Sequence, residues 1–193
     1  MSLAAALALA EKGFRVFRLA GKDGKESWET FYEIATNDEK IIRYWWDELS
    51  TDWNVGISTD DLLVVDYDVK NGLPGVAELA AHVAQGLPTD AVAQTRSGGY
   101  HVFLRLPEGV RLAPTQHKNK ATAIGESIDT KSMHGYVAGA GSEGYRWINE
   151  PASVADIPLA PDWLIAQIPR YQAKTDKPQL LPDDKLDTDS AKE

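Results

Sequence analysis

The feature that most constrains the fold is a succession of short strand-like segments, most of them bounded by Gly, Asp or Asn. Phe14–Leu19 alternates apolar and charged residues, as a half-buried strand does. Helices are expected at 2–12, after a cap formed by Thr36 and Glu39, and at 76–85 before Gly86. Further strands are expected at 54–58, 62–68, 91–96, 100–106, 127–129, 136–139 and 145–147. Many strands with a few inserted helices predict an α+β fold with a mainly antiparallel sheet.

Length and composition place this sheet in one domain of ordinary globular character. The chain has 193 residues, and we expect residues 1–170 to form the domain and residues 171–193 to be an acidic flexible tail or linker. The absence of cysteine excludes a disulfide framework, a cysteine zinc site and a thiol nucleophile. No apolar run approaches the roughly 20 residues that span a bilayer, and residues 2–10 lack a basic leader. We therefore expect a cytoplasmic protein with no membrane partner.

The charge is unevenly distributed along the chain. The formal net charge is -9, which argues against a generally basic surface. Residues 96–134, however, carry six Lys or Arg against three Asp or Glu. A polyanion is therefore expected to bind the middle of the chain.

The strongest local motif is Asp66-Tyr67-Asp68, which follows the apolar run 62–65. Side chains alternate along a strand, so Asp66 and Asp68 are expected on one face. Two such carboxylates repel unless a cation lies between them, and oxygen ligands suit Mg²⁺ or Mn²⁺. The alternative is a pair of solvated acids at a strand end.

The second motif is the segment 95–101, where Gly98 and Gly99 precede His101. Glycines allow close backbone approach, and their amides can point at an anion. Along a regular strand, His101 and Phe103 share one face. A plain Gly-Gly hairpin turn followed by a satisfied histidine remains the alternative.

Other motifs are weaker when taken singly. Asp129 is a candidate third metal carboxylate and Lys131 a candidate phosphate contact, although an acid near a base is usually a surface pair. Ser142 follows a strand and a tight turn, where it either bonds a ligand or simply ends the strand. Trp45 and Trp46 are expected in the core. The other histidines, His82, His117 and His134, show no metal-ligand spacing and are expected at the surface.

The order and spacing of these motifs resemble the bifunctional primase–polymerase domain of the archaeo-eukaryotic primase superfamily, found in replication proteins of phages, plasmids and other mobile elements. The similarity covers roughly residues 3–150. It is carried by 13–17, 35–38, 45–46, 54–57, 66–68, 95–101, 128–129, 135–137 and 141–142.

The resemblance implies a primase-type fold, with an RRM-like sheet that carries the acids and a smaller N-terminal α/β part beside it. It implies that Asp66, Asp68 and Asp129 hold two divalent ions, Mg²⁺ or Mn²⁺, that His101 contacts the triphosphate of a dNTP or NTP, and that Ser97 and Gly98 lie along it. The reaction would be template-directed nucleotidyl transfer on single-stranded DNA, making primers and extending them. Relatives often continue into a helical accessory domain or a helicase, which are the expected partners.

Four departures from the family pattern stand out, and none removes a proposed metal ligand. The loop 21–25 lacks the usual proline, Lys131 replaces an arginine, Ala140 replaces the proline of a Pro-Gly-Ser turn, and the chain has no cysteines for a zinc insertion, so no zinc is expected. Competing interpretations are a metal-dependent nuclease or phosphohydrolase, which uses water with the same acids, and a non-catalytic domain that binds single-stranded nucleic acid. The blandest is an α+β domain whose acids coincide by chance.

Overall fold

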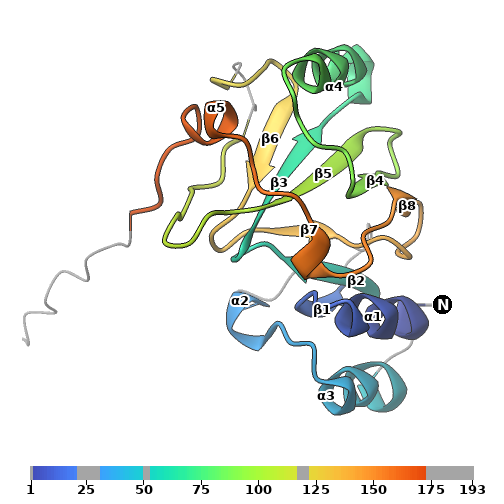
Figure 1. Ribbon diagram of the computed structural model, residues 1–193. Coiled ribbons are helices and arrows are strands. Elements are labelled where there is room, and N and C mark those ends of the chain that lie inside the picture. The colour runs from blue at the N-terminus through green and yellow to red at the C-terminus, as the bar shows by residue number, and fades with distance from the viewer. Residues whose placement is uncertain (1, 21–30, 50–52, 117–121, 173–193) are drawn as a thin grey trace, which may run out of the picture.

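The computed structural model describes residues 2–20, 31–49, 53–116 and 122–172 (Figure 1). Its strands are β1 (Val16–Leu19), β2 (Asn54–Ser58), β3 (Leu62–Tyr67), β4 (Val92–Gln94), β5 (Tyr100–Arg105), β6 (Ile128–Lys131), β7 (Tyr136–Ala138) and β8 (Arg146–Asn149). Its α-helices are α1 (Ser2–Glu11), α2 (Phe31–Ile34), α3 (Glu39–Arg43), α4 (Gly75–Ala84) and α5 (Asp162–Ile165). A π-helical turn (Tyr44–Leu49) extends α3, and short 3₁₀ turns occupy Lys70–Gly72 and Val154–Asp156.

The strands form two antiparallel sheets, which confirms the predicted α+β class. The smaller sheet has the order β1-β2-β7, and the larger has the order β6-β3-β5-β4-β8. The smaller sheet joins strands far apart in sequence, because Ile57 of β2 pairs both with Val16 of β1 and with Val137 of β7.

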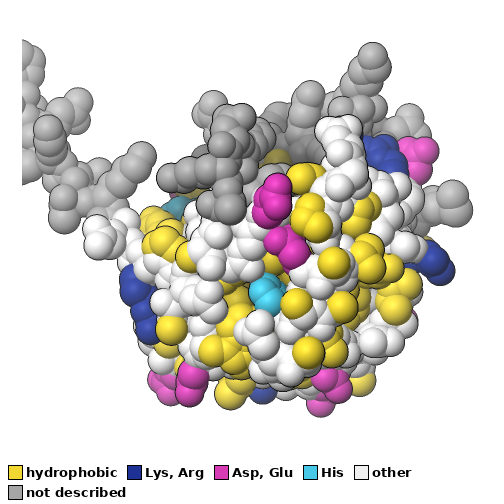
Figure 2. Space-filling model, turned by 90° about the horizontal axis from the view of Figure 1, so that it is seen from above, with side chains coloured by type: hydrophobic (Ala, Val, Ile, Leu, Met, Phe, Trp, Pro, Cys, Tyr) yellow, Lys and Arg dark blue, Asp and Glu magenta, His cyan; other side chains and the backbone are white. Residues whose placement is uncertain are grey.

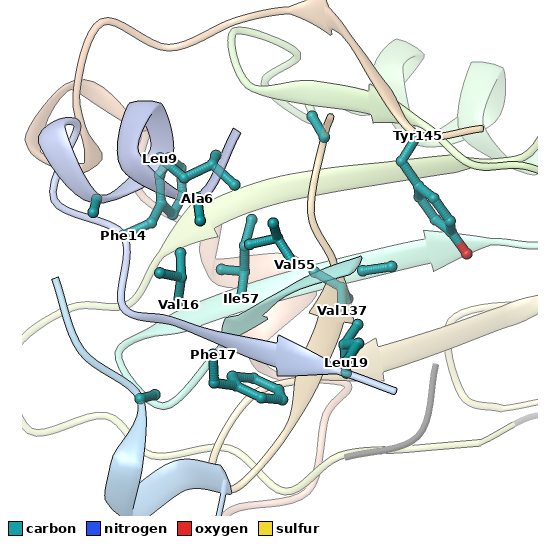
Figure 3. Packing of buried hydrophobic residues seen from close by; sticks show 14 of the residues in the cluster. Ala6, Leu9, Phe14, Val16, Phe17, Leu19, Val55, Ile57, Val137 and Tyr145 are labelled. Carbon is teal, nitrogen blue, oxygen red and sulfur yellow. The ribbon is translucent and has the colours of Figure 1, made fainter. Parts of the chain in front are cut away.

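The two faces of the larger sheet contribute to two separate cores. Leu62, Val64 and Phe103 face the first core, which α1, β1, β2 and the predicted core residues Trp45 and Trp46 also share. Figure 3 shows side chains of α1, β1 and β2 meeting in this core. Leu63, Val65, Tyr67, Val102 and Leu104 face the second core, which α5 and part of α4 cover. The period-2 alternation of β3 and β5 therefore sorts each strand between the two cores.

Seen from above, the described surface is mainly hydrophobic and uncharged, with acidic and histidine side chains near its middle and Lys and Arg at the margin (Figure 2). Val76 and Val83 of α4 are 57% and 43% exposed. Among the described helices, none combines the length and apolar character needed to cross a bilayer.

Two local expectations were wrong. The cap of α3 is Asp38, whose carboxylate accepts hydrogen bonds from the backbone N–H of Lys40 (2.8 Å) and Ile41 (3.4 Å). Thr36 cannot cap this helix, because its own backbone N–H and carbonyl pair with Val16 of β1. The strand predicted at 62–68 ends at Tyr67, so Asp68 lies just beyond it. Loop 21–25, His117 and the tail from residue 173 lie outside the described residues.

Candidate active site

Three of the predicted site residues lie side by side across the larger sheet. In the register of β3 with its neighbours, Asp66 pairs with His101 of β5 on one side and with Asp129 of β6 on the other. Residues directly opposite in antiparallel strands project to the same face. This row, Asp129–Asp66–His101, lies on the face of the sheet that the first core shares.

His101 is held firmly within this row. The residue is 5% exposed, and its Nε2 lies 3.6 Å from Asp66 Oδ1. Rings of Phe103 and Tyr145 lie 6.3 and 6.0 Å away between centroids. Its buried Nδ1 has no hydrogen-bond partner among the described residues. A buried polar atom in that state commonly indicates a group that meets a ligand or water.

Lys131 lies on the same strand as Asp129 and points to the same side. Its Nζ is 3.2 Å from Asp129 Oδ2, and the Lys131 and Asp129 side chains are 20% and 17% exposed. The predicted acid–base pair is therefore partly enclosed, unlike an ordinary surface pair.

Asp68 takes a different position from the other two acids. Its backbone N–H donates to the carbonyl of Ser127 (2.9 Å), and its carboxylate accepts from the N–H of Lys70 (2.8 Å). Both Asp66 and Asp68 nevertheless line the same cavity. Within the described residues, no three His, Asp or Glu side chains are gathered into a metal-binding cluster.

The glycine segment forms a tight hairpin between β4 and β5. The Gly98 N–H donates to the Thr95 carbonyl, and the Thr95 N–H donates to the Gly99 carbonyl, both at 2.9 Å. The turn itself uses the Gly98 amide, as the alternative of a Gly-Gly hairpin predicts. A Cβ at Gly99 would lie 2.3 Å from the Tyr67 carbonyl oxygen, so this turn packs directly against the end of β3.

A cavity of about 790 Å³ opens beside the row, between the two sheets. The larger sheet and its loops contribute Asp66, Asp68, Lys70, Thr95, Arg96, Ser97, His101, Lys131 and Tyr145, and the smaller sheet contributes Leu19, Tyr136, Val137 and Ala138. Two carboxylates and three cationic side chains thus line one cavity. Such a mixture suits a polyanionic ligand whose charge is shared with bound cations.

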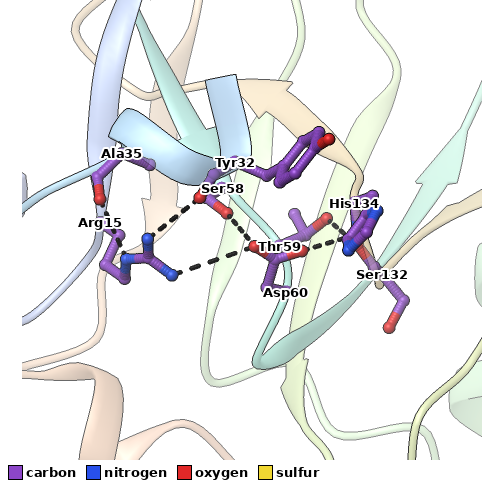
Figure 4. A network of polar contacts seen from close by, with 8 residues as sticks. All are labelled: Arg15, Tyr32, Ala35, Ser58, Thr59, Asp60, Ser132 and His134. Carbon is purple, nitrogen blue, oxygen red and sulfur yellow. Dashed lines mark hydrogen bonds and ion pairs between the residues drawn. The ribbon is translucent and has the colours of Figure 1, made fainter. Parts of the chain in front are cut away.

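A polar network fixes the two crossovers between the sheets at this cavity (Figure 4). Asp60, between β2 and β3, accepts from the backbone N–H of His134, between β6 and β7 (2.6 Å), and lies 3.9 Å from Arg15 Nη1. Thr59 Oγ1 donates to the carbonyl of Ser132 (2.8 Å). The loops on which the cavity depends are therefore tied directly to each other.

Ser142 lies apart from the cavity. It is 4% exposed, and its hydroxyl donates to the Val55 carbonyl (3.2 Å) and accepts from the Val55 N–H (2.9 Å). The residue fastens the turn after β7 to β2. Its predicted part in ligand binding has no support in this arrangement, because its hydroxyl is fully engaged.

A family model described as "Bifunctional DNA primase/polymerase, N-terminal" matches residues 6–163, which include the whole row and the cavity. The chain belongs to this family. No curated protein is similar enough to the chain to serve as a relative for comparison. Membership confirms the predicted resemblance and the primase-type fold, and it gives the chain a general DNA primase/polymerase function.

Primase–polymerase enzymes generally depend on divalent metal ions, and carboxylate oxygens are the ligands that such ions prefer. Mg²⁺ is commonly held by one or two carboxylates, with substrate phosphates completing its ligands. Asp66 and Asp129, opposed across the sheet, would hold the ion, and Asp68 lines the same cavity as Asp66. Asp68 would contribute a ligand after its carboxylate leaves the Lys70 N–H.

The structure adds residues to the site that the sequence did not single out. Lys70 and Arg96 line the cavity as cations, and Tyr136 and Tyr145 line it as rings. The only signal in the sequence was proximity along the chain: Lys70 lies two positions after Asp68, and Arg96 lies within the segment 95–101. His134 is exposed at the cavity, as expected of a surface residue, but His82 is buried and its Nδ1 lies 2.7 Å from Tyr67 Oη, so its predicted surface position was wrong.

Proposed function

We propose that this primase–polymerase domain catalyses template-directed nucleotidyl transfer on single-stranded DNA, in the replication of a mobile element. A 3′-hydroxyl attacks the α-phosphate of a bound nucleoside triphosphate, a new phosphodiester bond forms, and pyrophosphate leaves. The observation that carries this proposal is the row Asp129–Asp66–His101, in register across β6, β3 and β5, of which Asp66 and His101 line the cavity.

The volume and charge of the cavity support a nucleoside triphosphate as the substrate. Ligand pockets for molecules of this size are about 300–1,000 Å³, and the cavity has about 790 Å³. Lys70, Arg96 and Lys131 line it and can contact the phosphates, and the Ser97 hydroxyl beside them can donate to a phosphate oxygen. Gly98 shapes the turn that presents Ser97.

The protein groups suit positioning more than covalent chemistry. His101 is buried and held in place by Asp66 and two rings, so it can donate one hydrogen bond without reorganising. A donor that is already in position stabilises the transition state more than it stabilises the substrate before reaction. When bound by Asp66, Asp68 and Asp129, two divalent ions would supply the charge that the attacking and leaving oxygens need. Because Lys70, Arg96 and Lys131 line the cavity, the affinity for DNA and nucleotide should fall as the salt concentration rises.

The test is nucleotide incorporation on primed and unprimed single-stranded DNA with Mg²⁺ or Mn²⁺, using dNTPs and NTPs in separate reactions. An Asp66→Asn/Asp68→Asn double variant is the control for catalysis, and Asp90→Asn, whose residue is exposed and does not line the cavity, controls for loss of charge. Extension by the wild type and by Asp90→Asn, but not by the double variant, supports a polymerase.

The remaining outcomes separate the competing functions. Product on the unprimed template adds primase activity. Shortened template or released phosphate without extension would indicate a nuclease or phosphohydrolase. Binding of nucleotide, metal and DNA without turnover would point to a need for a downstream helical domain or helicase, whereas DNA binding alone would indicate a non-catalytic domain.

A further inference from the structure

Outside the cavity, the carboxylate of Glu78 accepts three hydrogen bonds from one segment of the chain. It accepts from the backbone N–H of Glu126 (2.6 Å), from the backbone N–H of Ser127 (3.1 Å) and from the Ser127 hydroxyl. Glu78 belongs to α4, whereas its three donors belong to the segment that leads into β6. Hydrogen bonds to an ionised carboxylate are roughly twice as strong as neutral ones.

Ser127, which Glu78 holds, bonds to Asp68 and lies two positions before Asp129 in the chain. Ser127 is fully buried, and its carbonyl accepts the backbone N–H of Asp68 (2.9 Å). Two positions later in the chain comes Asp129, which pairs with Asp66. Ser127 is thus fixed by Glu78 on one side and fixes the backbone of Asp68 on the other.

The helix itself closes this arrangement. The Gly75 N–H, at the start of α4, donates to the Asp68 carbonyl (3.2 Å). Asp68, α4 and the start of β6 therefore form a closed loop of hydrogen bonds, in which Glu78 is the only side chain that spans from helix to strand among the bonds described here.

The backbone at Gly125 packs closely against the Glu78 carboxylate. A Cβ at Gly125 would lie 2.6 Å from Glu78 Oε1 and 2.5 Å from Ile128 Cδ1. The segment approaches Glu78 so closely that a larger residue at position 125 would have to displace the side chains of Glu78 and Ile128. The carboxylate is therefore seated in one place, and its position is passed directly to the start of β6.

We propose that Glu78 is a positioning residue for the acidic site, setting the separation between Asp68 and Asp129 and so the fit of the divalent ion between β3 and β6. This inference rests on the proposed function, because it concerns the metal that the acids would hold. Mutation of a residue that orients a metal ligand commonly lowers metal affinity by about 10- to 100-fold.

The test is binding of Mn²⁺ to the full chain without nucleotide, measured from the signal of free Mn²⁺ in electron paramagnetic resonance. Glu78→Gln should bind Mn²⁺ about tenfold more weakly, because its amide NH₂ group faces a donor and cannot accept. Ser127→Ala removes one of three donors and should have a smaller effect in the same direction. Leu79→Ala is the matched control, since Leu79 packs on the second core from the same helix without touching this network.

A second readout needs no metal. Hydrogen exchange of the Asp68 amide, compared with that of Val102 in the middle of β5, should accelerate in Glu78→Gln and keep its wild-type ratio in Leu79→Ala. A purely structural role would lower the melting temperature of Glu78→Gln and of Leu79→Ala alike and leave Mn²⁺ affinity unchanged.

The outcomes distinguish this inference from the proposed function. If the wild type binds Mn²⁺ through Asp66, and folded Glu78→Gln binds it equally well, Glu78 has no positioning role. If Glu78→Gln does not fold, unchanged Mn²⁺ binding by Ser127→Ala overturns the inference. A wild type that binds no Mn²⁺, or an Asp66→Asn variant that binds it normally, overturns the metal assignment itself and the inference with it.

Discussion

Asp66→Asn should stabilise the metal-free protein while it abolishes nucleotide incorporation. Asp66 and Asp129 lie directly opposite each other on β3 and β6, so their charges are close and of the same sign. Like charges directly opposite in a sheet are destabilising. Removing one of these charges should therefore reduce the repulsion between the two carboxylates in the folded, metal-free protein.

The expected gain follows from the register and the local charges. Opposed Cα atoms lie about 4.5–5.5 Å apart, so the carboxylates are separated by roughly 6 Å and repel by about 3 kcal/mol at an effective dielectric constant near 20. Lys131 Nζ, 3.2 Å from Asp129, offsets most of this, and partial exposure of both acids reduces it further. About 0.5–1 kcal/mol remains, which raises the melting temperature by about 1–4 °C in a domain of this size.

The assay is thermal unfolding in EDTA and again in saturating Mn²⁺. Asp66→Asn should melt higher than the wild type in EDTA, and the order should reverse in Mn²⁺, because only the wild type gains from binding the ion. Asp68→Asn is the control, since Asp68 has no opposed carboxylate and asparagine can still accept from the Lys70 N–H. A lower melting temperature for Asp66→Asn in EDTA would refute the argument from repulsion.

Three further predictions concern single positions. Gly99→Ala should destabilise by about 2–4 kcal/mol in urea unfolding, because its Cβ would collide with the Tyr67 carbonyl. Ser142→Ala should lower the free energy of unfolding by about 1–2 kcal/mol and leave nucleotide affinity unchanged, since its hydroxyl serves only Val55; a rise in KM alone would contradict this. Burial lowers the pKa of His82 below its ordinary value of 6.5, so the unfolded state binds the proton more tightly. Stability should therefore fall as the pH drops below about 6.5, and His82→Gln should reduce that slope in melts across pH 5–8.

Much of the fold could be predicted because its strands alternate clearly. The apolar residues of β3 and β5 alternate between the two cores, as the sequence pattern predicts. The same alternation allows Asp66 and His101, which pair across these strands, to share one face. The division into two sheets could not be predicted from local pattern. Ile57 pairs with Val16 and Val137, and no local feature of β7 indicates that its partner lies about 80 positions earlier.

The site was predictable where function dictates residue type, and less so where backbone bonds decide. Packing alone rarely explains ionisable side chains on the core-facing side of a strand. Three such residues, Asp66, Asp129 and His101, lie side by side across the larger sheet. For Gly98 and Ser142 the sequence left two interpretations open, because an amide or hydroxyl can serve the chain itself as readily as a ligand, and in the structure both groups bond to the backbone. His82 was misplaced because its partner, the Tyr67 hydroxyl, belongs to a strand that precedes it by 15 positions.

The row Asp129–Asp66–His101 also determines when the candidate site can form during synthesis. Asp129 follows Asp66 by 63 positions, so at about 5–20 residues per second a ribosome releases it roughly 3–13 s later. Until β6 emerges and joins β3, the nascent chain has half of its acidic pair and an open sheet edge where β6 belongs. Such edges favour pairing with other strands. The pairing that brings Asp129 opposite Asp66 is thus also the step that covers the β3 edge of the nascent sheet and leaves β6 as the edge strand of the finished one.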